Sequence, residues 1–366
     1  MNKIGLIGGS FDPIHLGHTR IIKEAIKQLS LDQILIIPTK NNPWKNQSVA
    51  NDQQRVEMIK IAIKDIKQAK VEMIELESGD QEKNYTVDTI HLLKEKYQQD
   101  ELFYIMGMDQ ASQFDKWKKP KKIAKMVQLV AFLRPGYEMN ENLKKYHFQL
   151  ITVQATNESS SAFKAGNISM VDQNVLRYIT NEGIYLDYLV KPYMSKKRYQ
   201  HTCSVAKLAK EFAISNGLDG KKAYIAGMMH DIAKEMDKKD ALDLMKKYYS
   251  CYLDKPEPIY HQWLSAYVAK NTFFIDDMDI LQAIENHTTA SINMSKLDMC
   301  VYCADKLDPL RGYDSSQSIQ LCKDDIEQGF SNELKHFYKF SKKKNRQIDN
   351  CFYEIYKKYN KGDWNG

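Results

Sequence analysis

Residues 8–18 read Gly-Gly-Ser-Phe-Asp-Pro-Ile-His-Leu-Gly-His and directly follow a short apolar run at residues 4–7. That order predicts a buried strand, a glycine-rich turn and the start of a helix. At such a junction, unpaired backbone N–H groups and the helix dipole both face a bound anion. His15 and His18 lie three residues apart, so at a helix start they share one face and point toward the same ligand. The segment therefore predicts a phosphate site that carries two proton-bearing side chains.

Apolar strands and amphipathic helices alternate through the first half of the chain. The clearest further strands lie at residues 34–37, 102–106 and 127–133, and helical periodicity covers residues 56–66 and 87–97. This alternation predicts an α/β fold, a Rossmann-like parallel sheet with helices on both faces. Ligands of such sheets bind at the carboxyl ends of the strands, where the strand order reverses. Gly8, Gly9, Gly107 and Arg134 each follow a predicted strand, so we expect them to converge on one crevice.

The second half of the chain lacks this alternation. From Pro192 onward it reads as long amphipathic helices with few glycines. Pro192 is well placed to begin a helix, which makes Leu186–Lys191 the candidate linker. A chain of 366 residues is long enough for two domains, each with its own core. We therefore expect an α/β domain at residues 1–187 and an all-α domain at residues 192–366.

Composition and charge restrict the class of protein. The hydrophobic fraction of 43% is ordinary for a globular protein. The N-terminal apolar run is too short and too broken by glycine for a signal peptide, and no apolar stretch is long enough to span a bilayer. We therefore expect a cytoplasmic protein without a membrane partner. The net charge of +6 suits phosphate-bearing small molecules and does not require nucleic acid, and it leaves a homo-oligomer open.

The C-terminal residues 335–361 alternate basic and aromatic side chains. An RNA-binding segment would show the same pattern. We favour an amphipathic helix that docks on the domain and leaves a solvated lysine face. The apolar residues of its predicted docked face are Phe337, Phe340, Phe352, Ile355 and Tyr356.

Cys300 and Cys303 form a CxxC pattern. Such a pattern could be a redox pair or half of a zinc site, but no second CxxC accompanies it. The segment reads as a helix whose cysteines face a core. Ordinary buried thiols are therefore the favoured interpretation.

The first half resembles the nucleotidyltransferase superfamily through residues 8–18, and nicotinate-nucleotide adenylyltransferases through four further segments. Those segments are Tyr85-Thr86 with the following Val-Asp-Thr, Gly107-Met-Asp109 followed by Phe114 and Trp117, Leu133-Arg134-Pro-Gly, and Ser159–Lys164. The resemblance covers nearly all of residues 1–185. It implies adenylyl transfer from ATP to nicotinate mononucleotide, with Mg²⁺ on the β- and γ-phosphates and pyrophosphate as the leaving group. A preference for the nicotinate over the nicotinamide mononucleotide stays open at this point.

The same resemblance implies roles for individual residues. His15 and His18 would be catalytic, because they would stabilise the charge that develops on the transferring phosphoryl group. The implied ATP-binding residues are Gly8, Gly9, Ser10, Phe11, His15, His18, Gly107, Asp109, Arg134, Ser160, Ser161 and Lys164. The implied mononucleotide-binding residues are Lys45, Tyr85, Thr86 and Trp117.

Two departures from the family pattern bear on affinity rather than on reaction type. Lys164 stands where the family has arginine, so a point charge replaces a bidentate fork. Asn42-Pro-Trp-Lys45 stands where the family has Pro-Pro-His-Lys. A histidine on the phosphate side is therefore missing, although Lys45 remains.

A second constellation of histidines and aspartates occupies the helical half. His230-Asp231 is the adjacent pair after which the HD phosphohydrolases are named, and further histidines and an aspartate lie on separate predicted helices. Imidazole and carboxylate ligands suit divalent metal ions, and a pair of such ions can clamp an attacking hydroxide and a leaving phosphate oxygen. The predicted ligands of two metal ions are His201, His230, Asp231, His261, His287 and Asp305, with Asp231 as the bridge.

Residues 193–320 resemble the YqeK-type HD proteins. That resemblance implies symmetrical hydrolysis of diadenosine tetraphosphate to two ADP at two metal ions, iron or manganese. Asp231 and Lys234 would be catalytic, and Lys234 and Arg311 are the candidate phosphate contacts. His261 departs from the pattern, because the family's His-Gly reads His261-Gln262 here.

Two interpretations follow for the whole chain. The favoured one is a bifunctional enzyme, an adenylyltransferase fused to an HD phosphohydrolase. The alternative is an active adenylyltransferase whose HD domain is not catalytic, senses nucleotides and regulates the first domain. Metal content and ADP release from diadenosine tetraphosphate discriminate between the two.

Overall fold

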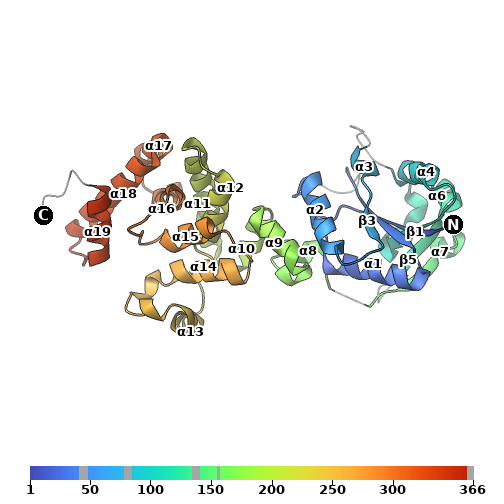
Figure 1. Cartoon of the computed structure of the whole chain (residues 1–366), viewed down its shortest axis with the longest axis horizontal. Helices are drawn as coiled ribbons and strands as arrows, with labels where there is room; N and C mark the ends of the chain where they lie inside the picture. Colours follow the sequence, from blue (N-terminus) through green and yellow to red (C-terminus); the bar gives the residue numbers. More distant parts are fainter. Residues whose placement is uncertain (41–47, 78–84, 134–140, 155–156, 361–366) are drawn as a thin grey trace. The chain divides into compact units, whose positions relative to one another are not determined.

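The computed structural model describes residues 1–40, 48–77, 85–133, 141–154 and 157–360. The chain divides into two units, Met1–Val175 and Leu176–Gly366, and each is described here by itself (Figure 1). The first unit contains a parallel sheet with helices, and the second is built from helices. The predicted fold classes of the two halves are therefore confirmed.

The strands of the first unit form one sheet. They are β1 (Lys3–Gly9), β2 (Gln33–Pro38), β3 (Ala69–Val71), β4 (Glu101–Gly107), β5 (Gln128–Leu133) and β6 (Gln149–Thr152). Their order is β3-β2-β1-β4-β5-β6, and each neighbouring pair is parallel. The three strands predicted beyond the first are confirmed as β2, β4 and β5. The edge strands β3 and β6 were not predicted, because they are short and carry few apolar residues.

The strand order predicts a ligand site at the carboxyl ends of the two central strands. The chain runs outward from β1 through β2 to β3, and then returns to the other side of β1 with β4. The order therefore reverses between β1 and β4, which end at Gly9 and Gly107. A crevice outside the carboxyl ends of two such strands is the usual ligand site of an open parallel sheet.

Helices cover both faces of the sheet. The helices of this unit are α1 (Leu16–Leu29), α2 (Asp52–Ile63), α3 (Ile74–Glu77), α4 (Thr86–Lys96), α5 (Met108–Ala111), α6 (Pro120–Met126), α7 (Glu141–Lys145) and α8 (Ser160–Lys164), with 3₁₀ turns at Phe114–Lys116 and Ile168–Met170. On one face, Leu6 and Leu129 belong to a core that includes Ile90 of α4, beside which α6 lies (Figure 1). On the other face, Ile22 of α1 and Ile36 are fully buried. Burial on both faces explains the nearly continuous apolar runs of these strands.

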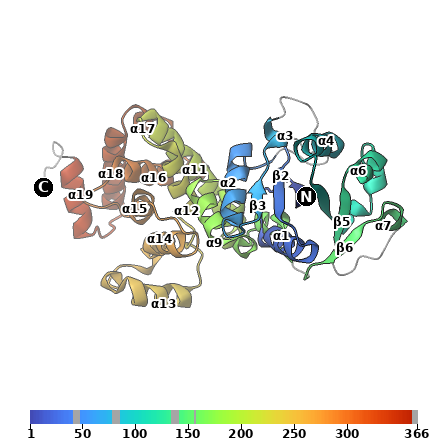
Figure 2. The same ribbon diagram turned by 45° about the vertical axis from the view of Figure 1, so that its right-hand side comes forward.

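The second unit is a set of packed helices (Figure 2). They are α9 (Gln173–Asn181), which begins three residues before the division, α10 (Leu186–Val190), α11 (Lys196–Ser215), α12 (Gly220–Met229), α13 (Lys238–Tyr248), α14 (His261–Asn271), α15 (Met278–Asn286), α16 (Lys296–Leu307), α17 (Ser316–Asp324), α18 (Ile326–Lys343) and α19 (Asn350–Tyr359), with four 3₁₀ turns at Lys191–Tyr193, Ser250–Tyr252, Glu257–Ile259 and Pro309–Arg311. Helix α11 packs against both α12 and α16, and α15 packs against α12 and α16. Gly227 lets α12 approach α11 closely, because a Cβ there would lie 2.6 Å from the Cα of Ala206.

The division between the units differs from the predicted domain boundary at residues 187–192. Residues from 176 onward pack with the helical unit: the Thr180 hydroxyl donates to the Phe273 carbonyl (2.6 Å) and the Asn181 amide donates to the Phe274 carbonyl (3.1 Å). The predicted linker forms α10, whose apolar side chains are buried. Pro192 lies in a 3₁₀ turn, and α11 begins only after the N-cap Ser195.

The C-terminal segment forms two helices, α18 and α19, rather than one. Phe352, Ile355 and Tyr356 are buried, which confirms docking of α19. Phe337 and Phe340 remain 43% and 48% exposed, so their predicted burial is wrong. The Phe337 ring still contacts Phe352 of α19, with 4.7 Å between the ring centroids, whereas Phe330 and Leu334 of α18 are fully buried.

Cys300 and Cys303 lie on α16 and are buried free thiols, as predicted. Burial raises the pKa of Cys300 to about 12, which keeps it protonated and unreactive near neutral pH. In the described part of the chain, no helix combines the length and the apolar character needed to cross a bilayer.

Candidate active sites

The two histidines of the phosphate turn lie at the start of α1. His15 is the N-cap residue in extended conformation, and its backbone N–H donates to Nδ1 of His18 (3.2 Å). This bond leaves the proton of a neutral His18 on Nε2, which is then a hydrogen-bond donor. The two imidazole rings lie 3.6 Å apart, and Phe11 packs edge-on against His18. The predicted common face of His15 and His18 is therefore present.

Asp12 ties the phosphate turn to distant parts of the first unit. Its carboxylate accepts the backbone N–H groups of Val49 (3.1 Å) and Ala50 (3.0 Å) and an ion pair from Lys164 (2.6 Å). Ser160 donates to the Pro13 carbonyl (3.0 Å). The start of α8 thus lies against the turn, as the implied ATP site requires.

Helix α8 has the predicted local structure. Ser159 caps it by accepting the backbone N–H of Ala162 (3.0 Å), and Ser161 is exposed on its first turn. The helix is only five residues long, so Lys164 lies near its C-terminal end. The ammonium group of Lys164 is half-buried where it meets Asp12.

Gly107 and Asp109 lie at the end of β4, beside the turn that follows β1. A Cβ at Gly107 would lie 2.3 Å from a carboxylate oxygen of Asp109, so a larger residue there would force the Asp109 side chain to move. Arg134 and Lys45, which the sequence assigned to ATP and to the mononucleotide, lie outside the described residues.

Two of the four residues predicted for the mononucleotide, Thr86 and Trp117, lie near Tyr104, which the sequence analysis did not single out. The buried Tyr104 hydroxyl is hydrogen-bonded to Thr86, and its ring lies edge-on to Trp117 at 6.1 Å. A Cβ at Gly8 would lie 3.2 Å from the same hydroxyl. Tyr104 therefore connects the phosphate turn with Thr86 and Trp117. The exposed ring of Tyr85 lies under the Lys118 ammonium at 3.8 Å.

Arg55 is a second residue that sequence reasoning missed. Its side chain is 1% exposed, although it carries a full charge. The guanidinium donates to the carbonyls of Ser10 (2.6 Å) and Thr39 (2.7 Å) and pairs with Asp52 (2.6 Å). Arg55 therefore fixes the phosphate turn to the end of β2.

The six predicted metal ligands of the second unit lie together, and five helices or their ends contribute them. His201 lies on α11, His230 and Asp231 directly follow α12, and Asp305 lies on α16. His261 begins α14, and His287 caps the end of α15. The structure thus brings together all six predicted ligands, although His230 and Asp231 lie on a turn rather than within a helix.

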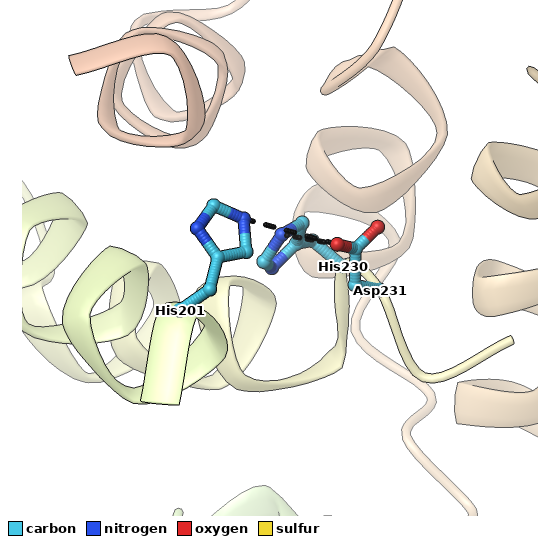
Figure 3. A group of neighbouring side chains, drawn as sticks. All are labelled: His201, His230 and Asp231. Carbon is cyan, nitrogen blue, oxygen red and sulfur yellow. Dashed lines mark ion pairs between the residues drawn. The ribbon is translucent and has the colours of Figure 1, made fainter. Parts of the chain in front are cut away.

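Asp231 lies at the centre of this site. Its Oδ2 lies 3.3 Å from Nε2 of His230 and 3.8 Å from Nε2 of His201 (Figure 3). Its Oδ1 lies 3.3 Å from Nε2 of His261 and 3.7 Å from Nε2 of His287. Two groups of three ligand atoms therefore form, and they share Asp231.

Asp305 extends the first of these groups. Its Oδ1 lies 3.1 Å from Nε2 of His201. Burial opposes ionisation of Asp305, but the charges of Lys306 and Arg311 outweigh it, so its pKa lies well below the usual range. The carboxylate is therefore ionised near neutral pH.

Burial also controls the charge of the histidines in the second group. It lowers the pKa of His261 to about 2, with a further contribution from the neighbouring His287, and it lowers the pKa of His287 as well. Both imidazoles are therefore neutral near pH 7 and can offer a lone pair. Burial opposes ionisation of Asp231 too, but the neighbouring His230 outweighs it and keeps the pKa of Asp231 well below the usual range.

Basic side chains contact several of the predicted metal ligands. Lys234 lies 3.1 Å from Nδ1 of His261, and Arg311 pairs with Asp305 (2.6 Å). The sequence analysis named both residues, and it missed Arg198, whose guanidinium pairs with Asp231 (2.7 Å). Arg198 precedes His201 by one helical turn, and that spacing is the signal that could have identified it.

These ligands fit divalent metal ions. The buried Nε2 atoms of His201 and His230 have no hydrogen-bond partner within the described ranges of the chain. Such atoms are costly to bury unless something accepts their lone pairs. Each group offers two imidazole nitrogens and a carboxylate oxygen, a donor set that suits iron, manganese or zinc.

Comparison with known proteins gives matches over both units. The Cytidylyltransferase-like family matches residues 6–165, and the HD domain family matches residues 198–310. A relative from Mycoplasma genitalium, named "Probable nicotinate-nucleotide adenylyltransferase/Ap4A hydrolase", is 31% identical over 343 residues, which cover 91% of this chain and 97% of that protein.

Two further proteins align with about half of this chain. The nicotinate-nucleotide adenylyltransferase of Bacillus subtilis is 33% identical over 192 residues, which cover 50% of this chain and 99% of that protein. A crystal structure from Clostridium acetobutylicum, described as a predicted HD superfamily hydrolase involved in NAD metabolism, aligns at a TM-score of 0.44 and 25% identity. That alignment covers 48% of this chain and 94% of the other.

Proposed function

Because this chain belongs to the family of the nicotinate-nucleotide adenylyltransferase/Ap4A hydrolases, we propose that its two units catalyse the two reactions in that name. The first unit transfers the adenylyl group of ATP to nicotinate mononucleotide and releases pyrophosphate. The second unit hydrolyses diadenosine tetraphosphate symmetrically to two ADP. Both reactions consume nucleotides of central metabolism, and we assign both to the cytoplasm.

In the first reaction, the 5′-phosphate of the mononucleotide attacks the α-phosphorus of ATP in line with the leaving pyrophosphate. The chain contributes mainly position and charge stabilisation, because no covalent intermediate is needed. His18 donates from Nε2 to the transferring phosphoryl group, and the adjacent ring of His15, 3.6 Å away between centroids, supports it. Mg²⁺ neutralises the β- and γ-phosphates when it is bound.

The mononucleotide lies between the phosphate turn and the start of α4. Thr86 meets the pyridine carboxylate, and Trp117 stacks on the pyridine ring. The supporting observation is Tyr104, which contacts Thr86 and Trp117 and also adjoins Gly8. Tyr104 thus adjoins both the phosphate turn and the residues proposed to bind the pyridine ring.

The observation that carries the second reaction is the sharing of Asp231 between two ligand groups. His201, His230, Asp231 and Asp305 would hold one metal ion, and Asp231, His261 and His287 would hold the other. Two such ions, iron or manganese, supply an activated hydroxide and a clamp for the leaving oxygen when they are bound. Lys234 and Arg311 bind the polyphosphate chain, and their charges help to select a longer chain over a pyrophosphate.

The decisive experiment compares the full chain with a His230→Ala variant on both substrates. The full chain is expected to form nicotinate adenine dinucleotide and to release two ADP from diadenosine tetraphosphate, with about two metal ions per chain. The variant is expected to keep the first activity and lose the second together with metal. A chain that binds diadenosine tetraphosphate without metal and without hydrolysis would instead support a sensing role for the second unit.

A further inference from the structure

The ring Nδ1 atoms of the four site histidines have different kinds of partner. Nδ1 of His230, His261 and His287 lies 2.6–2.9 Å from a backbone carbonyl three residues earlier, at Gly227, Pro258 and Ile284. Nδ1 of His201 instead lies 2.6 Å from the carboxylate of Asp308. One ligand of the six is therefore oriented by a charged acceptor.

Asp308 is itself held rigidly. It is 1% exposed, and its second oxygen accepts the Ser204 hydroxyl (2.6 Å) and the backbone N–H of Leu310 (3.2 Å). A carboxylate that accepts the Nδ1 proton fixes the ring tautomer, directs Nε2 at the site and increases the basicity of that nitrogen. Backbone carbonyls fix the ring in the same way, but they add less negative charge.

The two ligand groups also differ in their carboxylates. The His201 position, defined as His201, His230, Asp231 and Asp305, contains two carboxylates, whereas the His261 position, defined as Asp231, His261 and His287, contains only the shared one. A second carboxylate strengthens the attraction for a dication at close range.

The neighbouring cations act differently on the two positions. At the His201 position, Arg198, Lys306 and Arg311 pair with carboxylate oxygens, which keep further lone pairs for a metal ion. At the His261 position, the ammonium of Lys234 lies 3.3 Å from Nε2 of His261, the ligating nitrogen itself. Lys234 therefore competes with a metal ion for one lone pair and repels it.

We propose that Asp308 is a positioning residue for His201 and makes the two metal positions unequal, so that the His201 position binds a divalent ion more tightly and fills first. The inference rests on the proposed two-metal site of the second unit. It adds an order of filling, and it assigns a function to a buried aspartate outside the ligand set.

The test is a titration of the metal-stripped full chain with Mn²⁺ in the absence of nucleotide, with free Mn²⁺ followed by electron paramagnetic resonance. The unchanged chain is expected to bind two ions in steps about tenfold or more apart in dissociation constant. Asp308→Asn keeps an oxygen for Leu310 but loses the charge, so the tight step is expected to weaken about 10- to 100-fold while the weak step stays. His261→Ala is expected to remove the weak step and keep the tight one.

Two further variants keep the result interpretable. Asp298 is another buried carboxylate on α16, and it accepts hydrogen bonds from the amides of Gln282 and Asn286 rather than from a site histidine. Asp298→Asn is the matched control and is expected to leave both steps unchanged. Ser204→Ala removes one anchor of Asp308, and it is expected to weaken the tight step to a smaller extent even where Asp308→Asn does not fold.

The outcomes separate the inference from the proposed function. Two steps of equal affinity in the unchanged chain, or equal weakening of both steps by Asp308→Asn, would overturn the inference and leave the two-metal site intact. A chain that binds no Mn²⁺ would overturn the two-metal site itself.

Discussion

In the first unit, His15 and His18 lie at the start of α1, just beyond the carboxyl end of β1, whereas the four site histidines of the second unit come from four different helices or their ends and are largely buried. The first site is encoded largely by one local segment, residues 8–18, and distant groups such as Lys164 join it through Asp12. The ligands of the second site are dispersed from His201 to Asp305. A phosphate can be held by backbone donors at a helix start, so a short segment suffices. A metal ion needs several desolvated side chains, which only the packed fold brings together.

This difference predicts that the two activities can be lost independently. A substitution in one unit should abolish one reaction and leave the other at its original rate. The predictions below test that independence, beginning with the residue on which most of a site depends.

Asp231→Asn is expected to give the largest effect, because Asp231 is shared by both ligand groups. An amide carries no charge for a metal ion, so hydrolysis of diadenosine tetraphosphate should fall roughly a thousandfold or more, a loss of about 4 kcal/mol in transition-state stabilisation. Initial rates and metal analysis on the same sample measure the effect. Adenylyl transfer is the internal control. A variant that retained two ions and full hydrolysis would show that Asp231 is structural.

His18→Ala is the corresponding test in the first unit, where it should affect adenylyl transfer alone. Loss of one preorganised donor to the transferring phosphoryl group should lower kcat for adenylyl transfer about 10²- to 10³-fold. His18→Gln places an amide donor near the same position and should recover part of that loss. Hydrolysis and metal content should not change. Equal kcat for the Ala variant and the unchanged chain would remove His18 from the mechanism.

Arg55→Met tests whether the stability of the predicted ATP site in the first unit also depends on a buried charge. The substitution leaves the carbonyls of Ser10 and Thr39 without their donor, so the free energy of unfolding of the first unit should fall by about 2–4 kcal/mol. Arg55→Lys can reach one carbonyl at most and should cost about half as much. Denaturant unfolding of the full chain, followed by the tryptophan signal and by loss of adenylyl transfer, measures the change. Unchanged stability would mean that water replaces both bonds.

Features that a local motif or a run of apolar residues encodes could be predicted from the sequence. The strand-turn-helix segment at residues 8–18, the three long strands and the adjacent pair His230-Asp231 have such a signal, whereas the other four predicted metal ligands came from the resemblance to HD phosphohydrolases. The edge strands β3 and β6 have none, because three or four residues with few apolar side chains do not establish a period. The predicted linker became α10, because its buried leucines find a partner in α12 that lies far along the chain.

The supporting residues of both sites were harder to predict. Tyr104, Arg55 and Asp308 are single residues whose importance depends on a partner between 16 and 107 positions away. Tyr104 reads as one more apolar residue of a strand, and Asp308 reads as a helix-ending residue before a proline. Long-range pairing is decided by tertiary packing, which a pattern in one sequence does not contain. The wrong prediction for the burial of Phe337 and Phe340 has the same origin, because the packing of α18 in the folded unit decides how far each of its apolar side chains is covered.

Lys164→Arg is expected to give the smallest effect. It tests directly whether Lys164 contacts ATP in the predicted site of the first unit. Lys164 is a point charge that pairs with Asp12, so it offers a bound phosphate a less directed contact than a fork would. Arginine can keep the pair with one nitrogen and donate to a phosphate with another. The KM for ATP should therefore fall about threefold, with kcat unchanged, which corresponds to about 0.7 kcal/mol of binding. Lys164→Met is the matched control, and it should raise the KM for ATP about tenfold if the ammonium contacts the nucleotide. Equal KM values for all three chains would instead assign Lys164 to holding α8 against the turn.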